Sequence, residues 1–296
     1  MSLSANARDA LVRYREFMKN EAVAGSLKRS LSLAAPNNVP VSSVITDDNL
    51  RCTTKSGSII IGGAKYMLRP DFSEPHWFAM LKVLFMQELQ HDSSSDKAVL
   101  AKFIKSGAEL LRLESELGEV ISQRLLNIVE EARIDNIICR RFPGYIPMLR
   151  FTCYAKLDAY TEAPGALAAL FRELEIFSLT GMTAPDGLLD TVAKDLIDRA
   201  ILYESAAGCA ELCLELLSHI SRLISELCAI HDGSISELRI GIRDYAFSEA
   251  DRAEQQGDGC DSRLRRRSSP ETERGGTPDS GRDADGNKGD TGSSGS

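Results

Sequence analysis

Residues 87–91, which read QELQH, hold the side chains of this chain that are best suited to chemistry. One letter separates this segment from HExxH, in which two histidines one helical turn apart bind zinc and the glutamate acts as general base. Glu88 and His91 keep the positions of the base and the second histidine, and Gln87 stands where the first histidine would be. The segment is therefore either a metal site that has lost a ligand or an ordinary helix end.

A helical wheel places these polar side chains on an inward face. At about 100° per residue, Gln87, Glu88 and His91 continue an apolar stripe that begins earlier in the same helix. The stripe consists of Trp77, Met80 and Leu84, and the opposite, solvent-facing side consists of Lys82, Met86 and Gln90. An acid and an imidazole that face inward need partners or a metal, because burial without either is costly.

A second buried acid is predicted in residues 127–136, NIVEEARIDN. Glu130 shares its helical face with the apolar residues Leu126, Ile134 and Ile137, whereas Glu131 points elsewhere. We therefore expect Glu130 to be buried and to join Glu88 and His91 in one group.

Three segments of the chain, taken in order, resemble a known family. QELQH at 87–91, NIVEEARID at 127–135 and RRFPG at 140–144 are similar to the zincin-like part of the cobaltochelatase T subunit. The same motifs occur in related bacterial and phage proteins that carry a C-terminal von Willebrand A (VWA) domain. The resemblance covers roughly residues 45–150, and the segment IIIGGAKYMLRP occupies the place of a short β element in that family.

The resemblance implies a role for each matching residue. His91 would be a metal ligand, Glu88 the general base and Glu130 a third ligand, and Glu131 stands where the family has Asp. Gln87 makes the motif degenerate, because an amide oxygen is a poor zinc ligand. A hydrolytic site needs firm protein ligands to lower the pKa of its bound water. The resemblance therefore implies zinc as cofactor if the site is complete, and none if it is not.

Three functions follow from these residues. The favoured one is a non-catalytic or regulatory subunit that works with an AAA+ ATPase of the chelatase type, with a VWA-domain protein, or with both. The alternative is a metal-dependent, zincin-like hydrolase that uses Glu88 as base. The third is an iron or manganese site, because Glu88 and His91 have the ExxH spacing of di-iron helix bundles, although a second ExxH is missing.

Composition narrows the choice of partners and compartment. The net charge of −8 and the pI of about 5.2 argue against a broad nucleic-acid surface. Apolar runs are too short to span a membrane and the N-terminus lacks the apolar core of a signal peptide, so a cytoplasmic protein is expected. The seven cysteines are expected to be reduced. Cys209 and Cys213 lie four residues apart on a predicted helix, a spacing at which two thiols can share a metal, and the favoured interpretation is that they are small buried hydrophobes.

The hydrophobic periodicity predicts a mainly α protein with a small β-hairpin before the QELQH helix. Four regions are expected: an N-terminal helical segment (1–45), a degenerate zincin-like core (46–150), a helical extension (151–250) and a disordered tail or linker (251–296). A loop is expected over 38–48 and the element type of 235–247 is left open. Helices are predicted over 7–33 with an interruption near Gly25, 74–91, 97–113, 117–141, 150–160, 165–178, 186–204 and 209–230.

The C-terminal region also bears on function. The basic run RLRRRSSP at 263–270 is a phosphorylation or localisation signal, or simply solvated charge. No segment matches the metal-binding motif of a VWA domain, so the chain is expected to be a truncated or split relative of the family.

Overall fold

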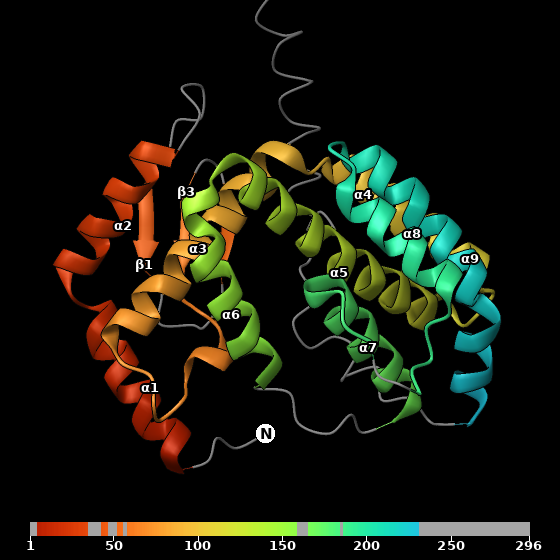
Figure 1. Cartoon of the computed structure of the whole chain (residues 1–296), viewed down its shortest axis with the longest axis horizontal. Helices are drawn as coiled ribbons and strands as arrows, with labels where there is room; N and C mark the ends of the chain where they lie inside the picture. The colour runs from red at the N-terminus through yellow and green to blue at the C-terminus, as the bar shows by residue number, and fades with distance from the viewer. Residues whose placement is uncertain are drawn as a thin grey trace, which may run out of the picture. The chain divides into compact units, whose positions relative to one another are not determined.

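The computed structural model describes residues 5–34, 43–46, 52–55, 58–158, 165–183 and 186–230. This part of the chain is mainly helical, as predicted, with nine α-helices and one small sheet (Figure 1). The segment 235–247 and the expected tail from residue 251 lie outside the described residues.

The first expected helix is two helices. α1 (Ala5–Met18) and α2 (Glu21–Ala34) are separated at Lys19 and Asn20, so the interruption predicted near Gly25 is wrong. The Asn20 side chain accepts a hydrogen bond from the backbone N–H of Ala22 at 2.9 Å, and its carbonyl accepts from Val23. Asn20 thus starts α2 as a helix cap, a role that asparagine favours. Gly25 lies inside α2, where the helix continues through it.

The sheet has three short strands, β1 (Ser43–Thr46), β2 (Cys52–Lys55) and β3 (Ser58–Ile61), in the order β1-β3-β2. β2 and β3 form the predicted antiparallel hairpin, and β1 pairs with β3 in parallel register. β1 lies within the segment expected to be a loop. Its residues Val44, Ile45 and Thr46 are β-branched, and this strand preference prevails over the turn signals around them.

α3 (Glu74–Ser94) begins where predicted, after Ser73 and with Pro75 in its first turn. It continues three residues beyond the expected end at His91. The helix ends because Asp96 caps the next one: the Asp96 carboxylate accepts from the N–H groups of Ala98 and Val99. α4 (Lys97–Leu111) follows directly, and α5 (Ser115–Arg141) ends just before Pro143, as predicted.

The remaining helices fall close to their predicted positions. They are α6 (Ile146–Asp158), α7 (Ala166–Thr180), α8 (Thr191–Leu202) and α9 (Ala206–Ile230). α8 is shorter than predicted at both ends, since Asp190 caps it by accepting from the N–H of Ala193 at 2.8 Å. None of the helices in the described part of the chain combines the length and apolar character needed to cross a bilayer.

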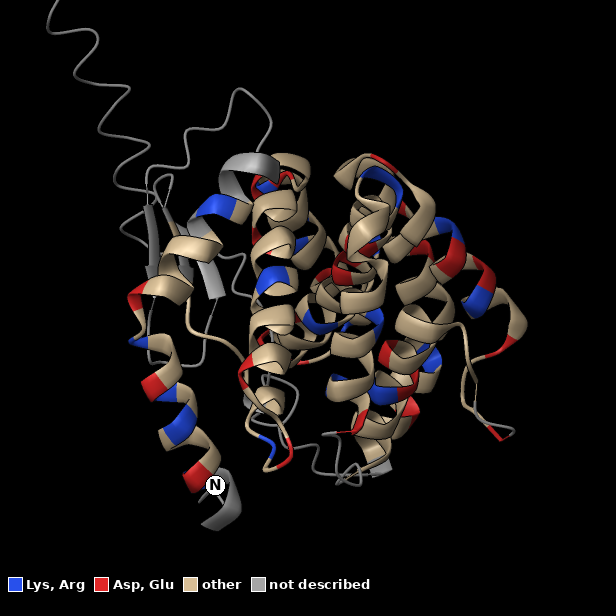
Figure 2. Cartoon of the chain, turned by 60° about the vertical axis from the view of Figure 1, so that its left-hand side comes forward, with Lys and Arg blue, Asp and Glu red and all other residues tan. Residues whose placement is uncertain are grey.

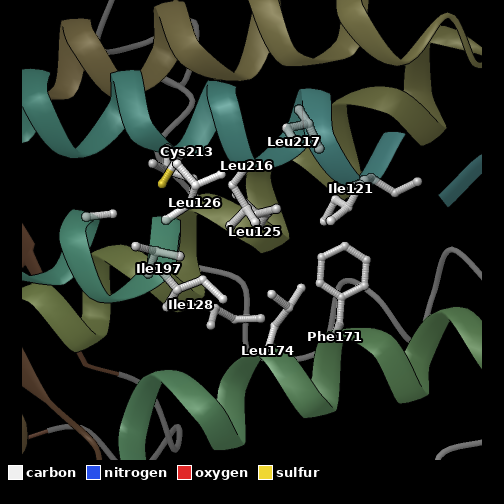
Figure 3. Packing of buried hydrophobic residues seen from close by; sticks show 14 of the residues in the cluster. Ile121, Leu125, Leu126, Ile128, Phe171, Leu174, Ile197, Cys213, Leu216 and Leu217 are labelled. Carbon is white, nitrogen blue, oxygen red and sulfur yellow. The ribbon is translucent and has the colours of Figure 1, made fainter. Parts of the chain in front are cut away.

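Two apolar clusters form the core, and α5 belongs to both. The α9 cluster joins α4, the first half of α5, α7, α8 and α9. Figure 3 shows Leu125 and Leu126 of α5 packed between α7 and α9. Cys213, labelled in the same view, belongs to α9. The α3 cluster joins α1, α2, β3, α3, α6 and the second half of α5, through Ile134, Ile137 and Ile138. The clusters therefore do not follow chain order.

α3 is enclosed on nearly all sides. It contacts α1, α2, β2, β3, α5 and α6. Met86 and Gln90, which were predicted to face solvent with Lys82, are buried, so that part of the prediction is wrong. The amide oxygen of Gln90 accepts a hydrogen bond from Arg141 of α5 at 3.2 Å, which gives this buried oxygen a partner. Acidic and basic residues are interspersed among the other residues of the helices in the view of Figure 2.

Replacing Gly63 by alanine is expected to destabilise the protein by about 2–4 kcal/mol. Gly63 has a φ of +84°, and an added Cβ would lie 2.3 Å from the hydroxyl of the buried Tyr14. Urea denaturation followed by circular dichroism measures the change. Gly144→Ala is the matched control, because no atom lies within 4 Å of its Cβ position, and it should change stability by less than about 0.5 kcal/mol. Equal effects of the two substitutions would refute the packing described for Gly63.

Candidate functional site

The QELQH segment faces α5 near the end of α3. Gln87 donates from Nε2 to the Asp135 carboxylate at 2.7 Å, and His91 Nε2 lies 3.2 Å from the Glu131 carboxylate. Residue numbers rise along α3 as they fall along α5, so the helices are antiparallel here. Two residues one turn apart on α3 therefore meet two acids one turn apart on α5.

The structure changes which acid meets His91. Glu131 was expected to point elsewhere and instead contacts the imidazole directly. Adjacent residues of a helix point about 100° apart, so only one of Glu130 and Glu131 can face α3 in this way. Glu130 is buried, as predicted, with 0% of its side chain exposed, but Ser95 lies between it and His91.

Arg133 holds both oxygens of Glu130. Its Nε and Nη2 atoms donate to the two carboxylate oxygens at 2.7 Å each, and Ser95 donates to the same carboxylate at 2.5 Å. Arg133 is itself 0% exposed, and it also donates to the carbonyl oxygens of Ser94 and Glu204. Sequence reasoning missed this residue, although its place three residues after Glu130 is the spacing of a helical ion pair.

His91 has a polar partner at each ring nitrogen. Nδ1 lies 3.0 Å from Ser95 Oγ, and Nε2 lies 3.2 Å from the Glu131 carboxylate. The Ser95 hydroxyl donates to Glu130, so the histidine, the serine and the two acids form one continuous set of polar contacts. Arg133 supplies the positive charge beside Glu130.

Asp135 has a strongly raised pKa. Burial raises its pKa to about 7, and the charge of Glu131 adds to the rise, while the Gln87 hydrogen bond and the charge of Lys156 oppose it. Burial likewise raises the pKa of the Cys153 thiol to about 12. The thiol of Cys153 therefore stays protonated near neutral pH and is not a ready metal ligand.

The other predicted residues lie as follows. Glu88 is buried, as its inward position on the wheel predicted. Cys209 and Cys213 are both buried in the α9 cluster, as expected of small hydrophobes. His76 belongs to the first turn of α3, and His219 pairs with Asp190 at 2.7 Å on the surface. His231 lies outside the described residues.

The residues present do not fit a zinc ion. Within the described ranges, no three His, Cys, Asp or Glu side chains are grouped closely enough to hold a metal. Gln87 offers only an amide, both ring nitrogens of His91 have polar partners, and Glu130 is bound by Arg133. The arrangement is suited to holding α3 against α5 by charge and hydrogen bonds.

Substitution of Arg133 by methionine is expected to cost about 3–5 kcal/mol of stability, because Glu130 would stay buried without its cation. Chemical denaturation measures the loss. Arg140→Met is the control, since Arg140 pairs with Glu204 at the surface, where both side chains are more than half exposed. It should cost at most about 1 kcal/mol. Adding Glu130→Gln to Arg133→Met should restore part of the loss, and equal losses in the two single variants would contradict the buried pair.

Replacing Asp135 by asparagine is expected to raise stability at pH 8 by about 1–2 kcal/mol. The raised pKa means that the folded protein holds a proton which the unfolded chain has already released above about pH 4. Wild-type stability therefore falls as pH rises from about 4 to 7, and asparagine removes this loss while keeping an acceptor for Gln87. The advantage should grow over that range and then level off. Thermal melts from pH 4 to 9 test this, and a constant difference would contradict it.

Comparison with protein-family models, curated proteins and solved structures found no match to this chain. The chemistry of the α3–α5 network therefore carries the functional conclusion.

Proposed function

We propose that this protein is a non-catalytic or regulatory helical subunit that works with an AAA+ ATPase of the chelatase type. The observation that supports its non-catalytic character is the closed network between α3 and α5. Three of the residues at motif positions there have side-chain partners: Gln87 binds Asp135, His91 binds Glu131, and Glu130 binds Arg133.

Catalysis by a zincin needs a ligand set with an open coordination position for water. In this network both ring nitrogens of His91 already have polar partners, Ser95 Oγ and the Glu131 carboxylate. The side chains are also withdrawn from solvent, with 6% of His91 and 17% of Glu131 exposed. Both features favour a structural role for the former catalytic positions.

The partner follows from the resemblance to the cobaltochelatase T subunit, and the same resemblance makes a VWA-domain protein a possible third component. α5 would be the element that transmits movement, because it lies in both apolar clusters. A change in one cluster on ATPase binding would then displace the other.

The partner proposal is tested by affinity purification of the full-length tagged chain from its native host. An AAA+ ATPase should be retained in the presence of a non-hydrolysable ATP analogue and lost in ADP. Arg140→Met, which alters only an exposed ion pair, is a control variant that should retain it equally. Absence of any AAA+ ATPase in the ATP-analogue sample would refute the proposal.

Zinc binding separates the non-catalytic role from the alternative hydrolase. Protein purified without chelator should contain no stoichiometric zinc and gain none at micromolar zinc. Gln87→His should raise zinc affinity, because the new imidazole lies one helical turn from His91 and opposite Asp135. The gain should disappear when Glu131→Ala is added. Calorimetric titration and metal analysis measure both, and wild-type zinc that is lost in His91→Ala would favour the hydrolase instead.

A further inference from the structure

A pocket of about 560 Å³ lies apart from the α3–α5 network, between the second half of α6 and the residues around the start of α3. Its volume is within the range of small-molecule sites in proteins, roughly 300–1,000 Å³. Aromatic rings from both segments line it: Phe72 and His76 from the α3 side, and Phe151 and Tyr154 from α6. A concave site lined in this way offers flat ring faces to a ligand.

Three of these rings already pack against one another, and the fourth is free for a ligand to contact. The centroid of the His76 ring lies 5.4 Å from those of Phe72 and Phe151, which are 5.6 Å apart. A ring inserted between two others needs about 7 Å, twice the contact distance of carbon atoms, so a ligand must use an outer face. Tyr154, one turn beyond Phe151 on α6, is 67% exposed and offers such a face.

One arginine joins the two sides of the pocket and uses its hydrogen-bond donors within the protein. Arg69 donates from Nε and Nη2 to the two oxygens of Asp71 at 3.0 Å each, and from Nη1 to Asp158 of α6. Its guanidinium also lies 4.9 Å from the centre of the Phe72 ring. Among the described residues that line the pocket, Arg69 is the only lysine or arginine. A phosphate group would have to displace these bonds to reach it.

The two carboxylates keep capacity to accept further hydrogen bonds. An ionised carboxylate has about four lone-pair positions, and the bonds from Arg69 occupy only part of them. The side chains of Asp71 and Asp158 are 60% and 65% exposed, so a ligand can approach both. Asp158 follows Tyr154 by four residues on α6, and this spacing puts both side chains on one face of the helix. A ring surface and a hydrogen-bond acceptor are therefore presented side by side.

We propose that this pocket binds a neutral, planar heteroaromatic ring with amino or N–H donors at its edge, which is the chemistry of a nucleobase. The ring stacks on Tyr154, and its edge donors bind Asp158 or Asp71. Base stacking on an aromatic side chain tolerates different bases, so the site selects for flatness and for edge donors. This inference goes beyond the proposed subunit function and does not depend on it.

Saturation-transfer NMR with adenosine tests the proposal on the full-length chain with no ATPase present, so its failure would leave the subunit function untouched. At millimolar adenosine, saturation of the protein should pass to the H2 and H8 protons of the base more strongly than to the ribose protons. Ribose alone should receive none. Adenosine 5′-monophosphate should bind several-fold more weakly than adenosine, because its phosphate is repelled by the carboxylates and finds no unpaired arginine in the pocket.

Variants of the exposed tyrosine locate the binding. Tyr154→Ala should lower the affinity for adenosine about tenfold, whereas Tyr154→Phe keeps the ring and should lower it by less than about twofold. The exposure of Tyr154 makes loss of folding unexpected, as circular dichroism can verify. Tyr203→Ala is the matched control, because it removes a tyrosine that is 47% exposed and lies outside the pocket, and it should bind as the wild type does.

Three results would overturn the proposal. The first is the absence of saturation transfer to adenosine in the wild-type chain. The second is equal affinity of the wild type and Tyr154→Ala, or an equal loss in Tyr154→Phe and Tyr154→Ala, since either would show that no ring stacks on this side chain. The third is tighter binding of the monophosphate than of adenosine, which would assign the pocket to an anionic ligand.

Discussion

The buried ion pair of Glu130 and Arg133 is the interaction on which the arrangement of the other helices depends. Both side chains are 0% exposed, and removing two charges from water costs several kcal/mol for each ion. Two short hydrogen bonds between them offset part of that cost, and the remaining donors of Arg133 need acceptors. They find the carbonyl oxygens of Ser94 at the end of α3 and Glu204 before α9. All of these donors therefore have acceptors only where the end of α3 and the segment before α9 come close to Arg133 of α5.

The same pairing decides what chemistry is possible between α3 and α5. With Arg133 on Glu130 and His91 between Ser95 and Glu131, these polar side chains have partners within the protein. A dication would have to displace these contacts in order to bind. Function depends on the site and not on the ancestry of the helices, which is why we favour a non-catalytic subunit.

A second set of ion pairs lies where α5, α6 and α7 approach one another. Glu175 of α7 is 4% exposed and binds Arg124 of α5 at 2.9 Å and Lys156 of α6 at 2.7 Å. Together with the Glu130–Arg133 pair, it makes the boundary between the two apolar clusters polar. Polar contacts have stricter distances and angles than apolar ones. Movement of one cluster relative to the other would therefore strain or break these ion pairs.

Local patterns in the sequence determined the helical fold, the start of α3 at Ser73, the end of α5 before Pro143 and the burial of Glu88, His91 and Glu130. Caps, prolines and periodicity act over a few residues and can be read directly. Tertiary structure alone decided that α3 is enclosed on both faces and that Glu131 meets His91. These outcomes depend on how α5 is rotated against α3. That rotation is set by two apolar clusters and a buried arginine contributed by segments far apart in the chain.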